Sequence, residues 1–202
     1  MTAEGRQMGE QIDLGAQAQC VKRLVAAVRE EQLKAPTPCP EYDVRALLGH
    51  LVGLTAAFRD AAAKELGPST GTDPGSALPQ LADDWRTRLP AQLDELAAAW
   101  RNPAAWEGTT QAGGIQLTAQ EAGVVALNEL VVHGWDLARA THQPYDPRPQ
   151  DLEVSRAMLA AFPEPEQRGT AFGAVVEVAE SAPLLERVIA LSGRPPSWTP
   201  EA

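Results

Sequence analysis

Cysteine is scarce in this sequence, and so is any long apolar run. The two cysteines, Cys20 and Cys39, are too few for the disulfide framework of a small secreted domain. No apolar stretch approaches the roughly 20 residues that a helix needs to cross a bilayer. The polar residues 1–10 lack the apolar core of a signal peptide. We therefore expect a cytoplasmic protein with no membrane partner.

Positive charge is also scarce. The 202 residues carry a formal net charge of −10, and the isoelectric point is near 4.8. Clustered lysines and arginines supply the phosphate contacts on which nucleic-acid binding depends, and the sequence contains no such cluster. We expect no nucleic-acid partner. The length suits one domain with a full core and a small appendage.

Apolar residues recur at spacings of three and four in long stretches separated by Pro- and Gly-rich segments. This periodicity predicts helices over residues 12–35, 44–66, 77–100 and 119–141. Asp43 is a good N-cap for the second helix, and Thr118 with Glu121 forms a capping box before the fourth. Pro90 predicts a kink or break near Leu89 in the third. Four such helices favour an all-α four-helix bundle.

The segments between and after these helices are shorter and more polar. We expect loops over 67–75 and 102–117, the second with a short hairpin around Gly113 and Gly114. A Pro-rich linker should follow at 143–150. Further helices are predicted over residues 151–161 and 182–192, with residues 172–178 short and mixed. The resulting division is a bundle over 1–142 and a small, mainly helical extension over 143–202 that packs on it.

Two of the three histidines occur inside apolar helical stretches, where an unpaired imidazole is costly. Glu129 and His133 are four residues apart, so their side chains lie on one face of a helix. His50 occupies the middle of another apolar segment. A single divalent cation held by His50, Glu129 and His133 would account for all three. Two imidazoles and a carboxylate favour Zn²⁺, Ni²⁺ or Fe²⁺ over Ca²⁺.

Spacing alone leaves a second interpretation open, in which Glu129 pairs with His133 or Arg139 without a metal. Asp136 follows His133 by three residues. It could orient a water or a ligand, or it could be solvated or paired with Arg139. Cys39 is interpreted as a small apolar side chain rather than a reactive thiol.

Two stretches resemble a known family. Residues 37–52, TPCPEYDVRALLGHLV, resemble the first motif of the mycothiol-dependent maleylpyruvate isomerase N-terminal family, and residues 129–138, ELVVHGWDLA, resemble its second motif. Residues 172–178 and 182–194 resemble an actinobacterial branch. The broader group is the DinB/YfiT-like metalloenzymes. The resemblance implies a four-helix bundle with an unusual connection and a divalent metal, usually zinc, on His50, Glu129 and His133.

The resemblance also implies a chemistry. The metal would stabilise the thiolate of a low-molecular-weight thiol such as mycothiol, and the thiolate would attack an electrophilic substrate. The protein would be a transferase or isomerase, as a monomer or homodimer. Arg45 and Arg139 are the candidates to line the pocket and bind the carboxylate-bearing partner of the thiol. The alternatives are a metal-dependent hydrolase with Asp136 as general base and a non-catalytic binding protein.

Overall fold

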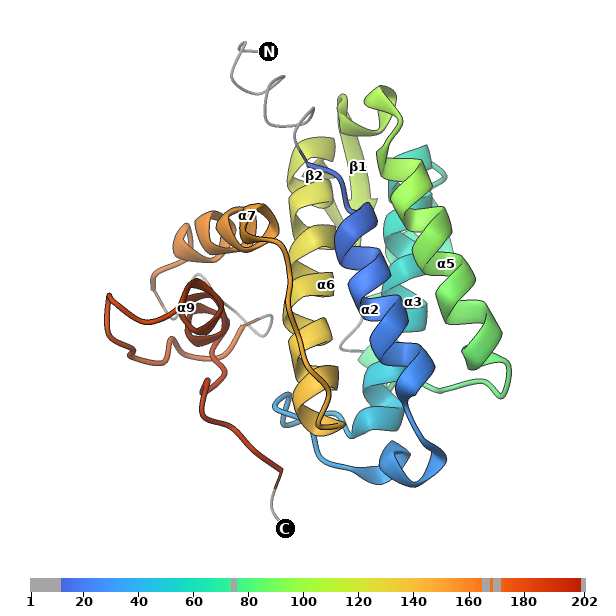
Figure 1. Ribbon diagram of the computed structural model, residues 1–202. Coiled ribbons are helices and arrows are strands. Elements are labelled where there is room, and N and C mark those ends of the chain that lie inside the picture. Colours follow the sequence, from blue (N-terminus) through green and yellow to red (C-terminus); the bar gives the residue numbers. More distant parts are fainter. Residues whose placement is uncertain (1–11, 74–75, 165–167, 169–171, 201–202) are drawn as a thin grey trace.

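The computed structural model describes residues 12–73, 76–164, 168 and 172–200. In this part of the chain the four longest helices pack side by side as a bundle (Figure 1). They are α2 (Gly15–Ala27), α3 (Val44–Ala63), α5 (Trp85–Trp100) and α6 (Ala119–Ala140). The predicted four-helix bundle is confirmed. A short two-stranded hairpin is its β component within the described residues.

The order of the helices around the bundle differs from their order in sequence. Both α5 and α6 pack against α2 and α3, so that the successive helices α2 and α3 lie diagonally opposite. Figure 1 shows α2 and α6 running in one direction and α3 and α5 in the other. Residues 64–84 form the long connection between the parallel neighbours α3 and α5. This topology places α3 beside α6, and the candidate ligands come from these two helices.

The bundle is held together by a continuous apolar core. Leucines from all four helices are buried in it. Leu24 of α2 is 4% exposed, and the others have no exposed surface: Leu47, Leu51, Leu89, Leu93, Leu96, Leu127 and Leu130. Their burial at helical spacing confirms the amphipathic pattern that predicted these helices. No helix in the described residues is both long and apolar enough to cross a membrane.

The first predicted helix, over residues 12–35, is wrong in its extent. α2 ends at Ala27, and a separate 3₁₀ turn, η1 (Glu30–Lys34), follows an extended Arg29. The Gln32 side chain explains the break. Its oxygen accepts a hydrogen bond from the Arg29 N–H at 2.9 Å, and its amide donates to the carbonyl of Thr141 at 3.0 Å. These contacts start a new helical turn and tie it to the end of α6.

Of the kink or break predicted near Leu89, the break does not occur. α5 begins at Trp85 rather than at residue 77, and Pro90 therefore lies in its second turn with the helix continuing through it. Only the hydrogen bond to the carbonyl of Arg86 is lost there. Likewise α3 ends at Ala63 because Lys64 adopts a left-handed conformation with φ 61°. A short helix, α4 (Pro68–Gly71), occupies part of the predicted loop.

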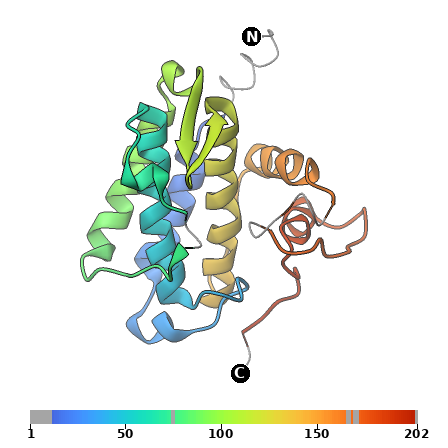
Figure 2. The same ribbon diagram turned by 180° about the vertical axis from the view of Figure 1, so that it is seen from behind.

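The hairpin expected around the glycine pair is present. After the turn η3 (Pro103–Trp106), β1 (Thr109–Ala112) pairs antiparallel with β2 (Ile115–Thr118). Gly113 and Gly114 have φ of 59° and 77°, as a two-residue turn with two positive φ angles requires. Figure 2 shows the hairpin on the side of the bundle where α3 and α6 meet. Thr118 and Glu121 form the predicted capping box at the start of α6.

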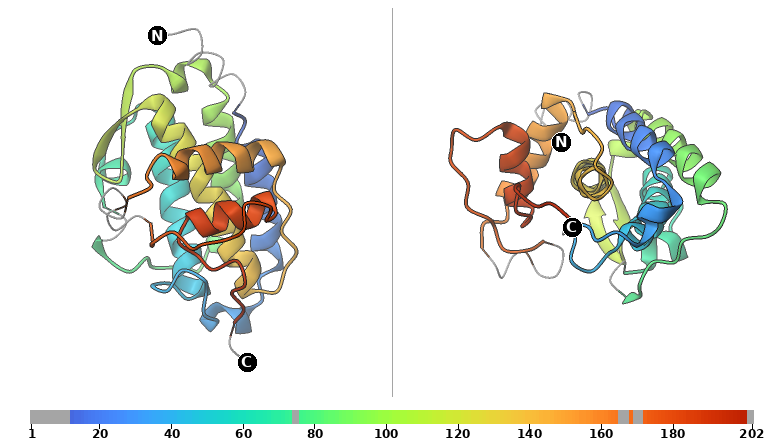
Figure 3. Two further views of the ribbon diagram at one scale, coloured as in Figure 1. Left: turned by 90° about the vertical axis from the view of Figure 1, so that its left-hand side faces the viewer. Right: turned by 60° about the horizontal axis from the view of Figure 1, so that its bottom comes forward.

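The C-terminal residues pack on one side of the bundle. α7 (Pro149–Ala160) packs against α6, and α9 (Leu184–Leu191) packs against α7. The left view of Figure 3 shows both helices crossing α6. The buried Arg168 side chain donates hydrogen bonds to the carbonyls of Phe162 at 3.0 Å and Gly173 at 2.7 Å. These contacts join Phe162, Arg168 and Gly173 within the extension.

Candidate metal centre

The start of α3 fixes the position of His50. The Asp43 side chain caps the helix by accepting a hydrogen bond from the Ala46 N–H at 2.8 Å, as predicted. The hydroxyl of Thr37 donates to the carbonyl of Tyr42 at 2.7 Å and holds the preceding loop closed. The ring of Tyr42 then lies against His50 with 5.3 Å between centroids. The imidazole of His50 is therefore confined between its own helix and this loop.

The neighbouring helix α6 brings two further ligand types to the same point. Oε2 of Glu129 lies 3.4 Å from Nε2 of His50 and 3.2 Å from Nε2 of His133. The two imidazoles meet edge to face with 4.7 Å between centroids. One ligand atom from each of the three residues lies within 4.8 Å of the others, and no other such group occurs in the part of the chain described above.

This donor set fits a divalent transition metal. Two ligand atoms at 2.0–2.2 Å from one tetrahedral ion are about 3.4 Å apart, close to the observed 3.2 and 3.4 Å separations. Imidazole nitrogens and a carboxylate oxygen are zinc ligands, and three of them leave a position for water or substrate. The side chains of His50, Glu129 and His133 retain 11%, 22% and 10% exposure, so the cluster is reachable from solvent.

Asp136 lies behind His133 and is completely buried. Its Oδ2 is 3.0 Å from Nδ1 of His133, and its Oδ1 accepts a hydrogen bond from Nε of Arg194 at 2.7 Å. In the neutral ring, a carboxylate at Nδ1 would keep the proton there and leave the lone pair of Nε2 facing Glu129. Of the roles considered from sequence, the geometry matches that of orienting a ligand; Arg139 is not its partner.

The three ligands have very different proton affinities. Burial lowers the pKa of His133, but hydrogen bonds and charges from Asp136 and Glu129 outweigh burial and raise it to about 9. For Glu129, burial would raise the pKa, but the two imidazoles beside it lower the pKa well below its usual range. Burial lowers the pKa of His50 despite its contact with Glu129. Without a cation, the proton of the cluster is therefore held by His133.

A hollow of about 370 Å³ lies at the loop before α3, beside Tyr42, and none of the three candidate ligands lines it. It is lined by Lys34, Pro36, Thr37, Cys39, Pro40, Glu41, Tyr42 and Asp43. Tyr42 belongs both to this hollow and to the wall of the cluster, because its ring contacts His50. Burial raises the pKa of the half-buried Cys39 thiol, although the charge of Arg194 partly opposes it. Both cysteines are free thiols, and Cys20 is buried in the core.

Arg45 and Arg139 contact residues other than the three candidate ligands. Arg45 is exposed at the start of α3 and lies 3.8 Å from a carboxylate oxygen of Glu30. Arg139 stacks over Trp135 and donates from Nε to the carbonyl of Trp198 at 3.0 Å. These contacts explain their positions without a ligand. The arginine that does lie next to the cluster is Arg194.

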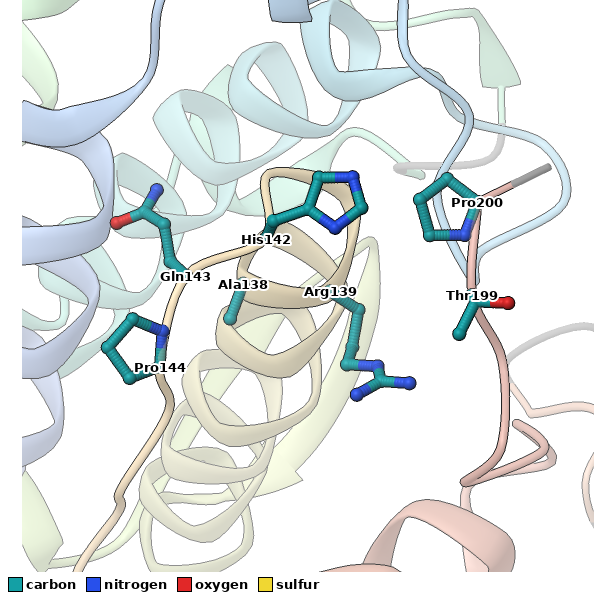
Figure 4. Close-up of a pocket in the computed structure, with 7 residues that line it drawn as sticks. All are labelled: Ala138, Arg139, His142, Gln143, Pro144, Thr199 and Pro200. Atoms are coloured by element: carbon teal, nitrogen blue, oxygen red, sulfur yellow. The ribbon is translucent and has the colours of Figure 1, made fainter. Parts of the chain in front are cut away.

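A second hollow, of about 330 Å³, lies at the end of α6. It is lined by Ala138, Arg139, His142, Gln143, Pro144, Thr199 and Pro200. Figure 4 shows Arg139 and His142 on the side of the helix that faces Thr199 and Pro200. His142 is exposed, as expected for a residue at a helix end. Glu129 and His133 do not line this hollow, so it is separate from the candidate centre.

Sequence reasoning missed Arg194 and Tyr42 as neighbours of the cluster. Arg194 is 58 residues from Asp136 in sequence, and no local pattern connects the two. One signal was present in the sequence: Arg194 directly follows Gly193, the glycine that ends the last helix. Tyr42 lies inside the first motif, next to the helix cap, and that position could have identified it.

Comparison with known proteins gives matches over much of the chain. The family model described as "Mycothiol maleylpyruvate isomerase N-terminal domain" matches residues 14–138. Uncharacterized proteins from two strains of Mycobacterium tuberculosis are each 30% identical over 147 residues, which cover 72% of this chain and 75% of the relative. The expected resemblance is thereby confirmed.

A solved structure shares the fold. The crystal structure of the mycothiol-dependent maleylpyruvate isomerase matches with a TM-score of 0.53 and 18% identity, over 79% of this chain and 70% of that one. At this identity the match establishes a common DinB-like architecture. From the family model, its extent and the two relatives, the chain is a member of the mycothiol maleylpyruvate isomerase N-terminal domain family.

Proposed function

We propose that this protein binds a divalent cation, preferably zinc and otherwise nickel or iron. With this cation and a mycothiol-like thiol, it acts as an isomerase or a transferase on an electrophilic substrate. The observation that supports this most is the convergence of His50, Glu129 and His133, with Asp136 behind His133. Three ligands with an oriented imidazole are typical of a catalytic rather than a structural zinc site.

The protein's own groups have separate tasks in this proposal. When bound, the cation supplies the positive charge that lowers the pKa of a coordinated thiol. His50, Glu129 and His133 hold it, and Asp136 keeps Nδ1 of His133 protonated. Formal charges support an anionic ligand. Glu129 and Asp136 contribute two negative charges and Arg194 one positive, so a divalent cation leaves the loaded centre with a net charge of +1, suited to one thiolate.

The hollow beside Tyr42 is the proposed entrance for the thiol, because the ring of Tyr42 also contacts His50. Its volume of about 370 Å³ falls in the range of small-molecule pockets. Tyr42 forms its boundary with the cluster and offers an aromatic face and a hydroxyl. Burial raises the pKa of this hydroxyl, so it remains a hydrogen-bond donor at neutral pH. Lys34, which also lines this hollow, adds a positive charge there.

Mycothiol is the proposed thiol because the family model is named for it and because the structural neighbour is a mycothiol-dependent isomerase. We propose residues 1–142 as the metal-binding bundle and residues 143–202 as an extension that closes one side of the centre through Arg194. We propose Arg194, in place of Arg45 and Arg139, as the arginine that supplies a positive charge close to the reacting groups.

A hydrolase is less well supported. The best general base for that reaction would be Asp136, and both of its oxygens are already engaged, one by His133 and one by Arg194. A buried carboxylate held in this way is poorly placed to take a proton from a metal-bound water. A non-catalytic binding protein is the remaining alternative, and turnover separates it from the proposed function.

The test begins with metal analysis of the purified protein after reconstitution with zinc, nickel or ferrous ions. The proposal expects about one equivalent bound, and loss of binding in His50→Ala, Glu129→Ala and His133→Ala. The loaded protein is then assayed with electrophiles, including maleylpyruvate, with and without mycothiol. Activity that requires both metal and thiol supports the proposal. Activity without thiol would favour the hydrolase, and metal binding without any turnover would favour a binding protein.

A further inference from the structure

The backbone of Arg194 is fixed by the end of α9. Gly193 adopts a φ of 87°, and the N–H groups of Gly193 and Arg194 donate back to the carbonyls of Ala190 at 3.0 Å and Ile189 at 3.2 Å. Two such backward hydrogen bonds after a left-handed glycine set the direction in which the chain leaves a helix. A Cβ at position 193 would lie 2.6 Å from the backbone of Gly173. Arg194 therefore starts from a well-defined position in the extension.

The side chain of Arg194 reaches from the extension into the bundle. Its Nε donates to Oδ1 of Asp136 at 2.7 Å, and its Nη1 donates to the carbonyl of Ser192 at 3.3 Å. Only 11% of this side chain is exposed, and Asp136 is fully buried. The second oxygen of Asp136 lies 3.0 Å from Nδ1 of His133. A continuous chain of contacts thus joins the extension to a candidate metal ligand.

Both oxygens of the buried Asp136 carboxylate have a partner, one Arg194 and the other His133, and each contact limits the movement of the carboxylate. With Oδ1 fixed by Arg194, the carboxylate of Asp136 has little freedom to rotate away from His133. Nδ1 of His133 then keeps its proton, and Nε2 stays directed at Glu129 and His50, so that its lone pair would face a cation that displaces the second proton. Without the guanidinium, Asp136 would remain buried beside a single partner, which is unfavourable for an ionised carboxylate.

We infer that Arg194 is a positioning residue of the metal centre, which acts through Asp136 to fix the orientation and tautomer of His133. The inference rests on the proposed function, because it assumes that a metal binds at this centre. The chain of contacts from Arg194 to His133 is present without a metal. The C-terminal extension then helps to orient a metal ligand, although all three candidate ligands come from the bundle.

The simpler alternative is that Arg194 only attaches the extension to the bundle. The extension has other attachments, because α7 packs directly on α6 and the carbonyl of Trp198 accepts hydrogen bonds from Arg139. A purely attaching role therefore predicts a modest loss of stability and an unchanged centre. A positioning role predicts a changed centre in a folded protein.

The first experiment measures zinc affinity by competition with a chromophoric chelator in Arg194→Met and Arg194→Lys. The control is Arg156→Met, which removes an arginine of the same extension that pairs with Glu153 on the surface at 2.8 Å. We expect Kd to rise about 10–100-fold in Arg194→Met, the usual effect of losing a group that orients a metal ligand. Arg194→Lys should recover part of the affinity, and the control should match the wild type. Wild-type affinity in a folded Arg194→Met would overturn the inference.

The second experiment tests whether Arg194 acts through Asp136. Zinc affinity is compared in Asp136→Asn, Arg194→Met and the double variant. If both residues belong to one chain, the double variant is no weaker than the weaker single variant. Losses that multiply would show independent roles and contradict the inference.

The third experiment observes His133 without metal, so that the inference can be judged even if the proposed metal function fails. Proton–nitrogen NMR of the imidazoles should show a hydrogen-bonded Nδ1–H of His133 in the wild type and in Arg156→Met. In Arg194→Met this resonance should shift or broaden, and in Arg194→Lys it should be intermediate. An unchanged resonance in every variant would overturn the inference. If circular dichroism shows that Arg194→Met does not fold, Arg194→Lys replaces it in all three experiments.

Discussion

Nδ1 of His133 lies 3.0 Å from Oδ2 of Asp136, less than one helical turn further along α6. On the other side of the same ring, Nε2 lies 3.2 Å from Oε2 of Glu129. The imidazole is therefore held between two carboxylates, of which one is fully buried and the other faces α3 and the solvent. This asymmetry gives the two nitrogens different tasks, one as a donor to Asp136 and the other as a ligand.

The first prediction concerns His133 itself. His133→Ala removes one of three ligands and should abolish zinc binding at micromolar concentrations while the bundle remains folded, because the side chain contributes little to the apolar core. Isothermal titration calorimetry measures the binding. The matched control is His142→Ala, which removes an exposed histidine beyond the end of the same helix and should leave one equivalent bound. Full zinc occupancy in His133→Ala would show that the metal centre is wrongly placed.

The second prediction concerns the pH dependence of metal binding. The pKa of His133 is raised to about 9 in the metal-free protein, so below pH 9 this ring carries the proton that a cation must displace. Zinc affinity should therefore fall as the pH falls, by about tenfold for each unit between pH 8 and pH 6. Binding at pH 7 should release about one proton to the buffer.

The proton release can be measured by calorimetry in two buffers of different ionisation enthalpy. Asp136→Asn should release a smaller fraction of a proton at pH 7, since the charge that helps to raise the pKa of His133 is gone. Release that is absent in the wild type, or zinc affinity that is independent of pH in this range, would contradict a protonated His133 in the metal-free centre.

The third prediction concerns Cys39, which lines the hollow beside Tyr42. Its thiol is half-buried, and burial raises its pKa, so it is protonated at neutral pH and not a ready metal ligand. Cys39→Ser should therefore keep the zinc stoichiometry and affinity of the wild type. Cys20→Ser is the control for loss of the other thiol. A large loss of zinc in Cys39→Ser alone would make Cys39 a fourth ligand.

Most of the fold could be predicted from local patterns. The apolar spacing in α3 and α6 and the caps at Asp43 and Thr118 are properties of short segments, so they determine where these helices begin. The incorrect limits of the first helix have a tertiary cause. Gln32 donates to the carbonyl of Thr141 across the bundle, and no spacing rule within residues 12–35 reveals that contact.

The residues of the candidate site also fall into those that local sequence patterns reveal and those that they do not. Glu129 and His133 could be paired from sequence because their spacing alone places them on one helix face. His50 could be added because it occupies the middle of an apolar segment. Arg194 could not be found, because it meets Asp136 only after the extension has folded back over α6. Long-range contacts made by single side chains leave no periodic signal.

The last prediction compares two helical glycines beside the centre. A Cβ at Gly134 would lie 2.9 Å from Oη of Tyr145. That hydroxyl cannot move freely, because it donates to the carbonyl of Val131 at 2.6 Å and accepts from Nε2 of Gln17 at 2.7 Å. Gly134→Ala should therefore cost about 1–3 kcal/mol of unfolding free energy through overpacking, which outweighs the usual gain of alanine in a helix.

Gly53 in α3 is the matched position, because a Cβ there meets no atom within 4 Å. Gly53→Ala should stabilise the protein by about 0.5–1 kcal/mol, since alanine restricts the unfolded chain more than glycine does. Urea denaturation of both variants without metal measures the two effects at one pH. The opposite signs separate the contact with Tyr145 from general helix propensity, because propensity alone would stabilise both variants. If Gly134→Ala were as stabilising as Gly53→Ala, the close packing of Tyr145 on α6 next to His133 would be wrong.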